Sequence, residues 1–167
     1  MSIWKTKNHC MTVGIISDTH GLIRKEALEA LKDADLILHA GDIGKPKVLD
    51  ELQKIAPLVA VRGNCDKDEW SRQLPETEVV NIGELRFYLI HNIGKLNIVP
   101  KADGIDAVVY GHSHKFSEEK KEGVLYLNPG SAGPKRFNLP ITVALLHVNG
   151  KKIEVERHLI GGSNQPK

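Results

Sequence analysis

The sequence predicts an α/β fold in which two mixed β-sheets pack face to face and helices cover their outer surfaces. In the first half, short aliphatic segments alternate with segments of helical periodicity, which is typical of parallel strands joined by crossover helices. In the second half, aliphatic segments come in pairs separated by short turns, which predicts antiparallel hairpins. The length of 167 residues, without internal repeats, favours one domain over residues 1–167.

The first half contains two expected helices between three expected strands. The segment 24–32 places Ala27, Leu28 and Leu31 on one helical face. A second helical segment begins near Pro46, and proline is tolerated in the first turn of a helix. The expected order is a strand at 12–16, a helix at 24–32, a strand at 36–39, a helix at 45–56 and a strand at 58–61.

The second half is expected to be mostly strands. Gly83 and Glu84 separate one pair of aliphatic segments, and Asn149 with Gly150 separates another, a strong hairpin signal. The charged run 118–122 alternates in sign and is expected to be a solvated turn, while residues 1–10 are polar and are expected to form a flexible extension. The expected strands are 78–82, 85–91, 107–110, 124–127, 141–148 and 152–158.

Composition excludes several classes of function. The net charge is +2 and no basic run stands out, so no nucleic-acid partner is indicated. Cys10 and Cys65 lie far apart without C-x-x-C spacing, which argues against a disulfide framework and fits a reducing compartment. No apolar run approaches the ~20 residues that span a bilayer, and the first ten residues lack an apolar signal core. We therefore expect a cytoplasmic protein without a membrane partner.

Five of the expected strands end in polar clusters that contain potential metal ligands. In open α/β sheets, ligands bind beyond the carboxyl ends of the strands, so these clusters are candidates for one shared site. Their imidazoles, carboxylates and amide suit Mn²⁺, Fe, Ni²⁺, Co²⁺ or Zn²⁺ rather than a calcium cage or a thiolate site. Seven ligands exceed the need of one tetrahedral ion and suit two ions that share a carboxylate. The candidates are Asp18, His20, Asp42, Asn64, His91, His112 and His114.

The order of these clusters resembles that of the calcineurin-like metallophosphoesterase superfamily, in particular its small bacterial and archaeal phosphodiesterase branch. Any one motif alone is weak evidence, but five in the family's order, spanning nearly the whole chain, are specific. The motifs are D-x-H at residues 18–20, G-D at 41–42, G-N-C-D at 63–66, a lone His91 after a strand, and G-H-x-H at 111–114, with a further N-P-G-S element at 128–131.

The resemblance implies a four-layer αββα sandwich and a metal site with divided roles. Asp18, His20 and His114 would hold one ion, Asn64, His91 and His112 the other, and Asp42 would bridge them. Of these, we expect Asp42, Asn64 and His91 to act in catalysis, by attack of a metal-bridging hydroxide on phosphorus. Manganese is the cofactor that we expect first, with nickel, iron, zinc and cobalt as alternatives.

Two positions depart from the superfamily's common pattern. Cys65 stands where many members carry a histidine thought to stabilise the leaving group or transition state, and Asn92 stands where relatives often carry glycine. A thiol with a pKa of about 8.5 is a poor acid, so Cys65 is expected to pack, and Asp66 or a metal-bound water is left as the proton donor. The residues that we expect to contact substrate are Arg136, Asn128, Cys65 and Asp66.

Some roles stay open at this level. His39, just before the G-D motif, either orients a ligand or is a satisfied core histidine. Asn128 either lines the floor of the pocket or serves as a turn residue before Pro129.

The leading hypothesis is a two-metal phosphodiesterase that hydrolyses small phosphodiester or nucleotide-like substrates. A phosphomonoesterase or protein phosphatase is the rival enzyme, although protein phosphatases of this superfamily are usually larger. A scaffold is the alternative from another class, because a subunit of the eukaryotic retromer complex resembles this branch but has altered ligand positions. The family also includes dimers and tetramers, so a homo-oligomer is one of the states that stay open, as do the natural substrate and the metal.

Overall fold

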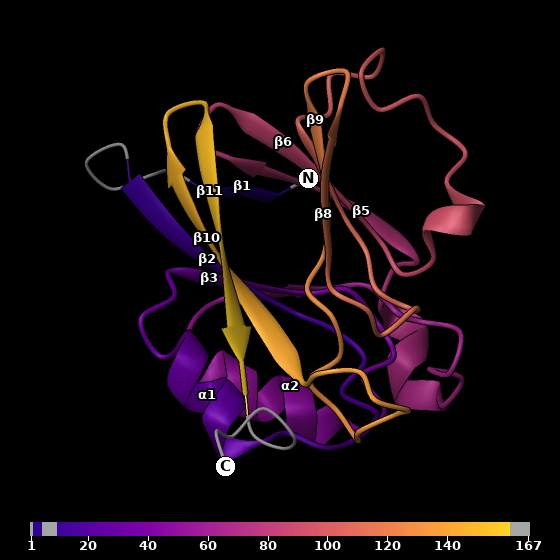
Figure 1. The fold of residues 1–167 in the computed structure, drawn as a ribbon. Helices are drawn as coiled ribbons and strands as arrows, with labels where there is room; N and C mark the ends of the chain where they lie inside the picture. Colours follow the sequence, from indigo (N-terminus) through magenta and orange to yellow (C-terminus); the bar gives the residue numbers. More distant parts are fainter. Residues whose placement is uncertain (1, 5–9, 161–167) are drawn as a thin grey trace.

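A computed structural model of the protein describes residues 2–4 and 10–160, and it contains two β-sheets packed face to face (Figure 1). One sheet has five strands in the order β11-β10-β2-β3-β4, and the other has six in the order β1-β5-β6-β7-β9-β8. The strands are β1 Ser2–Trp4, β2 Cys10–Ile16, β3 Leu36–His39, β4 Leu58–Ala60, β5 Thr77–Ile82, β6 Leu85–Ile90, β7 Ala107–Val109, β8 Ser117–Lys121, β9 Val124–Asn128, β10 Thr142–Asn149 and β11 Lys152–Leu159.

Two α-helices cover the outer face of the five-stranded sheet. They are α1, Lys25–Leu31, and α2, Pro46–Gln53. Leu31 and Leu52 are fully buried and pack in one cluster with Ile37 of β3, so each helix buries its apolar stripe on the sheet. Among residues 2–4 and 10–160, no helix is both long enough and apolar enough to cross a membrane.

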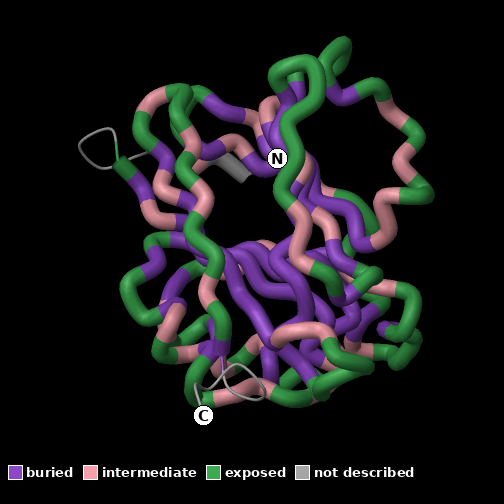
Figure 2. The backbone as a smooth tube through the Cα atoms, viewed as in Figure 1, coloured by how far each residue is buried: buried purple, intermediate pink, exposed green. Residues whose placement is uncertain are grey.

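The core between the sheets follows from the alternation of side chains along each strand. Val13 and Ile15 of β2 face Phe87 and Leu89 of β6 across the interior, and all four are fully buried. The next residue of β2, Ile16, belongs to the cluster under the helices instead. Figure 2 shows the buried segments gathered at the centre and the exposed ones at the hairpin tips and outer loops.

A fourth layer covers the outer face of the six-stranded sheet. Tyr88 and Ile90 of β6 pack there with Ile105 and with the short 3₁₀ turn η2, Ile93–Lys95. The predicted four-layer α/β fold is confirmed, with one difference. This outer layer is a single 3₁₀ turn and extended chain, whereas both α-helices lie on the other sheet.

Three local predictions change in the structure. The solvated turn predicted at residues 118–122 is wrong, because Ser117–Lys121 forms the edge strand β8, whose exposed charges are typical of a sheet edge. Asn149 pairs with Lys152, so the last hairpin turns one position later than predicted. Ser2–Trp4 of the expected extension pairs with β5, whereas residues 1 and 5–9 lie outside the described residues.

The sheet topology brings strand ends from both halves of the chain to one place. β2, β3 and β4 are parallel neighbours in one sheet, and β6, β7 and β9 are parallel neighbours in the other. After β4, the chain runs through a second 3₁₀ helix, η1, Glu69–Gln73, before it enters the other sheet. The loops that follow these parallel strands carry the polar motifs.

Candidate metal centre

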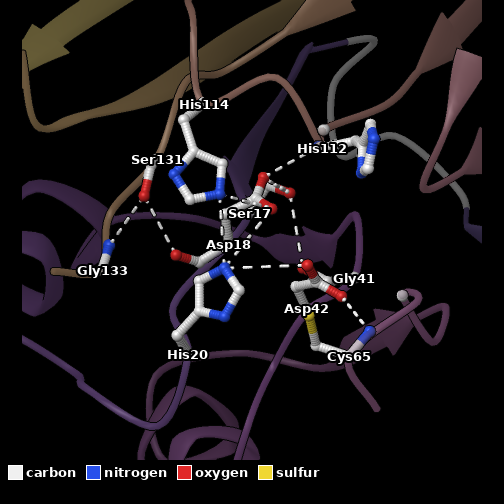
Figure 3. Close-up of polar contacts among 12 residues, drawn as sticks. Ser17, Asp18, His20, Gly41, Asp42, Cys65, His112, His114, Ser131 and Gly133 are labelled. Atoms are coloured by element: carbon white, nitrogen blue, oxygen red, sulfur yellow. Dashed lines mark hydrogen bonds and ion pairs between the residues drawn. The ribbon is translucent and has the colours of Figure 1, made fainter. Parts of the chain in front are cut away.

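All seven candidate ligands lie in loops that follow the carboxyl ends of these parallel strands. Asp18 and His20 follow β2, Asp42 follows β3 and Asn64 follows β4, whereas His91 follows β6 in the other sheet. His112 and His114 follow β7. Figure 3 shows Asp18, Asp42, His20 and His114 directed toward one another from these separate loops.

Asp18, His20 and His114 form the first group of potential ligands. The Nε2 atoms of His20 and His114 lie 3.3 Å apart, and His114 Nε2 lies 3.3 Å from Asp18 Oδ1. One ligand atom from each residue falls within 4.8 Å of the others, although His20 and His114 are 94 positions apart in sequence. This spacing allows one ion to bind all three.

Asp42 lies between that group and His91. Its Oδ2 is 3.7 Å from His20 Nε2 and 3.3 Å from His91 Nε2, while its Oδ1 accepts a hydrogen bond from the Cys65 amide at 2.9 Å. The other ring nitrogen of His91, Nδ1, lies 2.8 Å from the carbonyl oxygen of Ala40. Since a carbonyl only accepts, Nδ1 donates to it, and this contact directs Nε2 toward Asp42. Burial lowers the pKa of His91, but its contacts with Asp42 and Asp18 together raise that pKa by more, so the net shift is upward.

Asn64 and His112 lie beside His91 on the far side of Asp42. Asn64 Oδ1 is 3.1 Å from His112 Nδ1, and the rings of His91 and His112 meet edge to face with centroids 5.3 Å apart. The backbone amide of His112 also donates to Asp18 Oδ2 at 3.1 Å, which joins the two groups of ligands. The structure thus places the seven residues in two adjacent groups with Asp42 between them.

The donor set fits divalent transition metals. Asp18 Oδ1 and His91 Nε2 are buried without a hydrogen-bond partner among the described residues, which is costly unless a further group binds them. Burial raises the pKa of both Asp18 and Asp42, but the contacts of Asp18 with His114, His91 and Ser17, and those of Asp42 with His91, His20 and the Cys65 amide, together lower each pKa by more, so both carboxyls are ionised at neutral pH. Burial lowers the pKa of His20, which keeps its ring neutral. Carboxylate oxygens and imidazole nitrogens are the ligands that such ions prefer.

Backbone strain concentrates at the same residues. Asp18, His20, Asp42, His112 and His114 have φ angles of 56°, 46°, 55°, 73° and 63°, in the left-handed region that non-glycine residues rarely adopt. Such conformations cost on the order of 1–3 kcal/mol each and persist where the surrounding structure enforces them. The strained φ angles therefore indicate that the surrounding structure holds these ligand residues in place against their local backbone preference.

Two glycines make room for the carboxylates. A Cβ atom at Gly63 would collide with the carboxylate and backbone nitrogen of Asp42, and one at Gly111 would collide with Ser17 and Asp18. Both residues belong to the predicted motifs, and only glycine allows these loops to approach the carboxylates so closely.

His39 supports the ligands from the core without joining them. It is fully buried, and its Nδ1 accepts a hydrogen bond from the Gly41 amide at 3.1 Å, so its Nε2 carries the proton. Nε2 donates to Thr19 Oγ1 at 3.0 Å, and Thr19 donates in turn to the carbonyl of Ile43 at 2.9 Å. Burial lowers the pKa of His39 to about 4. His39 is therefore a satisfied core histidine, one of the two roles that the sequence left open, and it contacts residues beside Asp18 and Asp42 rather than the ligands themselves.

Asp66 joins two loops of the site, and its predicted substrate contact stays a prediction. It is buried, and its carboxylate accepts hydrogen bonds from the backbone amides of Ile43, Gly44 and Gly63 at 3.1, 3.0 and 2.8 Å. Both of its oxygens are therefore occupied in joining the loops after β3 and β4.

Asn128 also supports a loop, in keeping with the turn role that the sequence left open, and its predicted substrate contact stays a prediction. Its Nδ2 donates to the Gly111 carbonyl and to Ser113 Oγ, both at 3.0 Å, and its Oδ1 accepts from the Gly130 amide. The neighbouring Ser131 donates to the backbone carbonyl of Asp18 at 3.0 Å.

Support residues such as Ser17, Thr19 and Ser131 were not identified from the sequence. The only sequence signal for these three residues is that each lies inside or beside one of the motifs.

Cys65 and Arg136 lie at the exposed side of the centre. The Cys65 sulfur falls within 4.8 Å of ligand atoms of His20 and Asp42. Burial and the charge of Asp42 raise the pKa of Cys65, so the thiol stays protonated near neutral pH. The positive charge of Arg136 lowers the pKa of both His20 and Cys65, so this charge acts on the metal centre. The substrate contacts predicted for Cys65 and Arg136 stay predictions, and the positions of both residues beside the centre are compatible with them.

Comparisons with known proteins agree with this geometry. A family model described as the calcineurin-like phosphoesterase superfamily domain matches residues 11–151. A probable metallophosphoesterase of Methanothermobacter thermautotrophicus is 33% identical over 162 residues, which cover 87% of this chain and 91% of the relative.

Two solved structures extend the likeness to the fold. An archaeal phosphodiesterase superposes with a TM-score of 0.77 at 27% identity, covering 90% of this chain and 100% of that one. Vps29 from Entamoeba histolytica, solved in complex with Zn²⁺, superposes with a TM-score of 0.69 at 26% identity, covering 89% and 99%. The chain therefore belongs to the calcineurin-like phosphoesterase superfamily and is a metal-dependent phosphoesterase.

Proposed function

We propose that the chain is a phosphodiesterase that hydrolyses small phosphodiester or nucleotide-like substrates with two divalent metal ions. One observation carries this proposal: the Oδ2 of Asp42 lies between His20 Nε2 and His91 Nε2, at 3.7 and 3.3 Å. A carboxylate between two groups of ligands is the arrangement that two-metal hydrolases use. The solved archaeal phosphodiesterase of the same fold supports the diester specificity.

The ligand roles follow from the two groups. Asp18, His20 and His114 would hold one ion, Asn64, His91 and His112 the other, and Asp42 both. When bound, two such ions supply an activated hydroxide at neutral pH and neutralise charge on the phosphoryl oxygens. Manganese is the ion that we propose first, and the zinc complex of the Vps29 neighbour makes zinc the main alternative.

The chain itself contributes orientation and charge. The amide of Cys65 and the carbonyl of Ala40 fix the directions of Asp42 and His91, so that their free atoms face one point. The guanidinium of Arg136 would bind a non-bridging phosphoryl oxygen at the exposed side. The Cys65 thiol, with its raised pKa, would fill space rather than donate a proton.

The test compares three proteins on bis(p-nitrophenyl) phosphate with Mn²⁺: wild type, Asp42→Asn and the matched control Asp68→Asn. Asp68 is exposed in the loop before η1 and lies outside both ligand groups. We expect Asp42→Asn to lower kcat at least about a hundredfold and calorimetry to show two ions per wild-type chain. Asp68→Asn should match the wild type. Equal rates in all three proteins would refute the proposal.

The same assay separates the alternatives. A rate with p-nitrophenyl phosphate well above that with the diester would indicate a phosphomonoesterase. Binding of two ions without turnover of either ester would indicate a scaffold, the role that the retromer-like alternative requires.

A further inference from the structure

A side pocket opens directly beside the candidate metal centre. It has a volume of about 300 Å³ and lies between the loop after β4, the start of β5, the end of β6 and the turn η2. Asn64 and His91 line this pocket and also belong to the metal centre. The pocket and the metal centre therefore share two residues, so a group attached to a phosphorus atom at the centre would lie beside the pocket.

The walls of the side pocket are cationic and rich in amides. Arg62 and Lys95 line it, together with the side chains of Asn92 and Asn97. The one acidic residue in the lining, Glu76, is mostly exposed and pairs with Arg62 at 3.2 Å. Two cations face one acid, so the pocket favours an anionic ligand.

Lys95 is the cation that is free to bind such a ligand. Within residues 2–4 and 10–160, no carboxylate lies within 4.0 Å of its ammonium group, whereas Arg62 already has a partner. Its backbone is nevertheless anchored, because η2 is capped by the Asn92 side chain, which accepts from the Gly94 amide at 2.9 Å. Ile93 packs the same turn onto the six-stranded sheet. A lysine on an anchored turn loses less freedom on binding than one on a mobile loop.

The volume limits the ligand to a small group. Pockets for small molecules span about 300–1,000 Å³, so this one lies at the lower end of the range. Amide side chains and an ammonium group are suited to phosphate and sugar oxygens.

We propose that the side pocket binds an ester arm of the substrate that carries a phosphate of its own, and that Lys95 is the main contact of that phosphate. This inference rests on the proposed phosphodiesterase function, which it refines. The preferred substrates are then phosphodiesters with a second, terminal phosphate, such as a 5′-phosphorylated dinucleotide.

The first experiment compares hydrolysis of thymidylyl-thymidine with and without a 5′-phosphate in Mn²⁺. We expect the wild type to have a KM roughly tenfold lower for the phosphorylated form, the factor expected for one charge-assisted hydrogen bond. In Lys95→Gln, the ratio of the KM values without and with the 5′-phosphate should fall to about one. Lys101→Gln removes an equally exposed charge outside the pocket and should retain the wild-type ratio.

The second experiment measures binding, independently of turnover. Calorimetry of the Mn²⁺-loaded protein should show roughly tenfold tighter binding of thymidine 3′,5′-bisphosphate than of thymidine 5′-monophosphate, and Lys95→Gln should abolish the difference. Wild-type protein that binds both equally, or a Lys95→Gln variant that keeps the difference, overturns the side-pocket inference. Binding that depends on Lys95 without hydrolysis of any diester overturns the phosphodiesterase function instead.

Discussion

Because His39 is buried, we predict that the free energy of unfolding falls as the pH is lowered. Its pKa is about 4, against an ordinary value of 6.5, because burial removes the charged form from water. The hydrogen bond from the Gly41 amide adds to this effect, since a protonated Nδ1 would place two N–H groups face to face. Protonation therefore opposes the folded state.

The sign and size follow from proton binding. Above pH 6.5, His39 is neutral in both the folded and unfolded chains, and stability is not affected. Between pH 6.5 and about 4, only the unfolded chain binds the proton, so the free energy of unfolding falls as the pH falls. The two pKa values differ by about 2.5, which at about 1.36 kcal/mol per unit amounts to about 3 kcal/mol in total, of which about 2 kcal/mol is lost by pH 5.

The assay is urea unfolding at pH 7.5, 6 and 5 with a chelator present, for wild type and His39→Gln. Glutamine retains a donor toward Thr19 but does not titrate, so this variant should lose about 2 kcal/mol less than the wild type between pH 7.5 and pH 5. At pH 7.5 it should be less stable by about 1–3 kcal/mol, because the Gly41 amide loses its acceptor. His147→Gln, at a partly exposed histidine of β10 that lies outside the core, should keep the wild-type pH dependence between pH 7.5 and pH 5. Parallel pH profiles of wild type and His39→Gln would refute the reasoning.

Three further substitutions test the loops around the metal centre. Asp66→Ala removes the acceptor of three backbone amides and should lower the free energy of unfolding by about 2–4 kcal/mol, whereas Asp68→Ala nearby should change it by less than about 0.5 kcal/mol in the same urea titration. Cys65→Ser should keep kcat within about threefold, because the protonated thiol takes no part in proton transfer; a loss beyond about tenfold would contradict this role. Gly63→Ala forces a Cβ against Asp42 and should weaken Mn²⁺ binding in calorimetry at least about tenfold, and unchanged affinity would show that the loop can move aside.

The sequence by itself determined the fold class and the candidate ligands. Strand periodicity and the polar residues that follow each strand are local signals, so alternating segments predicted the parallel strands and their carboxyl-terminal loops. The motifs Asp18 to His20 and Gly111 to His114 could be found for the same reason, because each lies within a few neighbouring positions.

Only the tertiary structure decided how these residues meet. The contacts of His114 with Asp18 and His20 join the ends of β2 and β7, which belong to different sheets, and no local pattern encodes the pairing of two sheets. The backbone contacts of Asp66 and Asn128 could not be predicted, because an isolated carboxylate or amide in a turn has the same sequence signal whether it faces a substrate or backbone amides. The same holds for Lys95, since its free ammonium group and the side pocket are products of packing between distant segments. Sequence determines which groups a strand end carries, while the packing of the two sheets determines their partners.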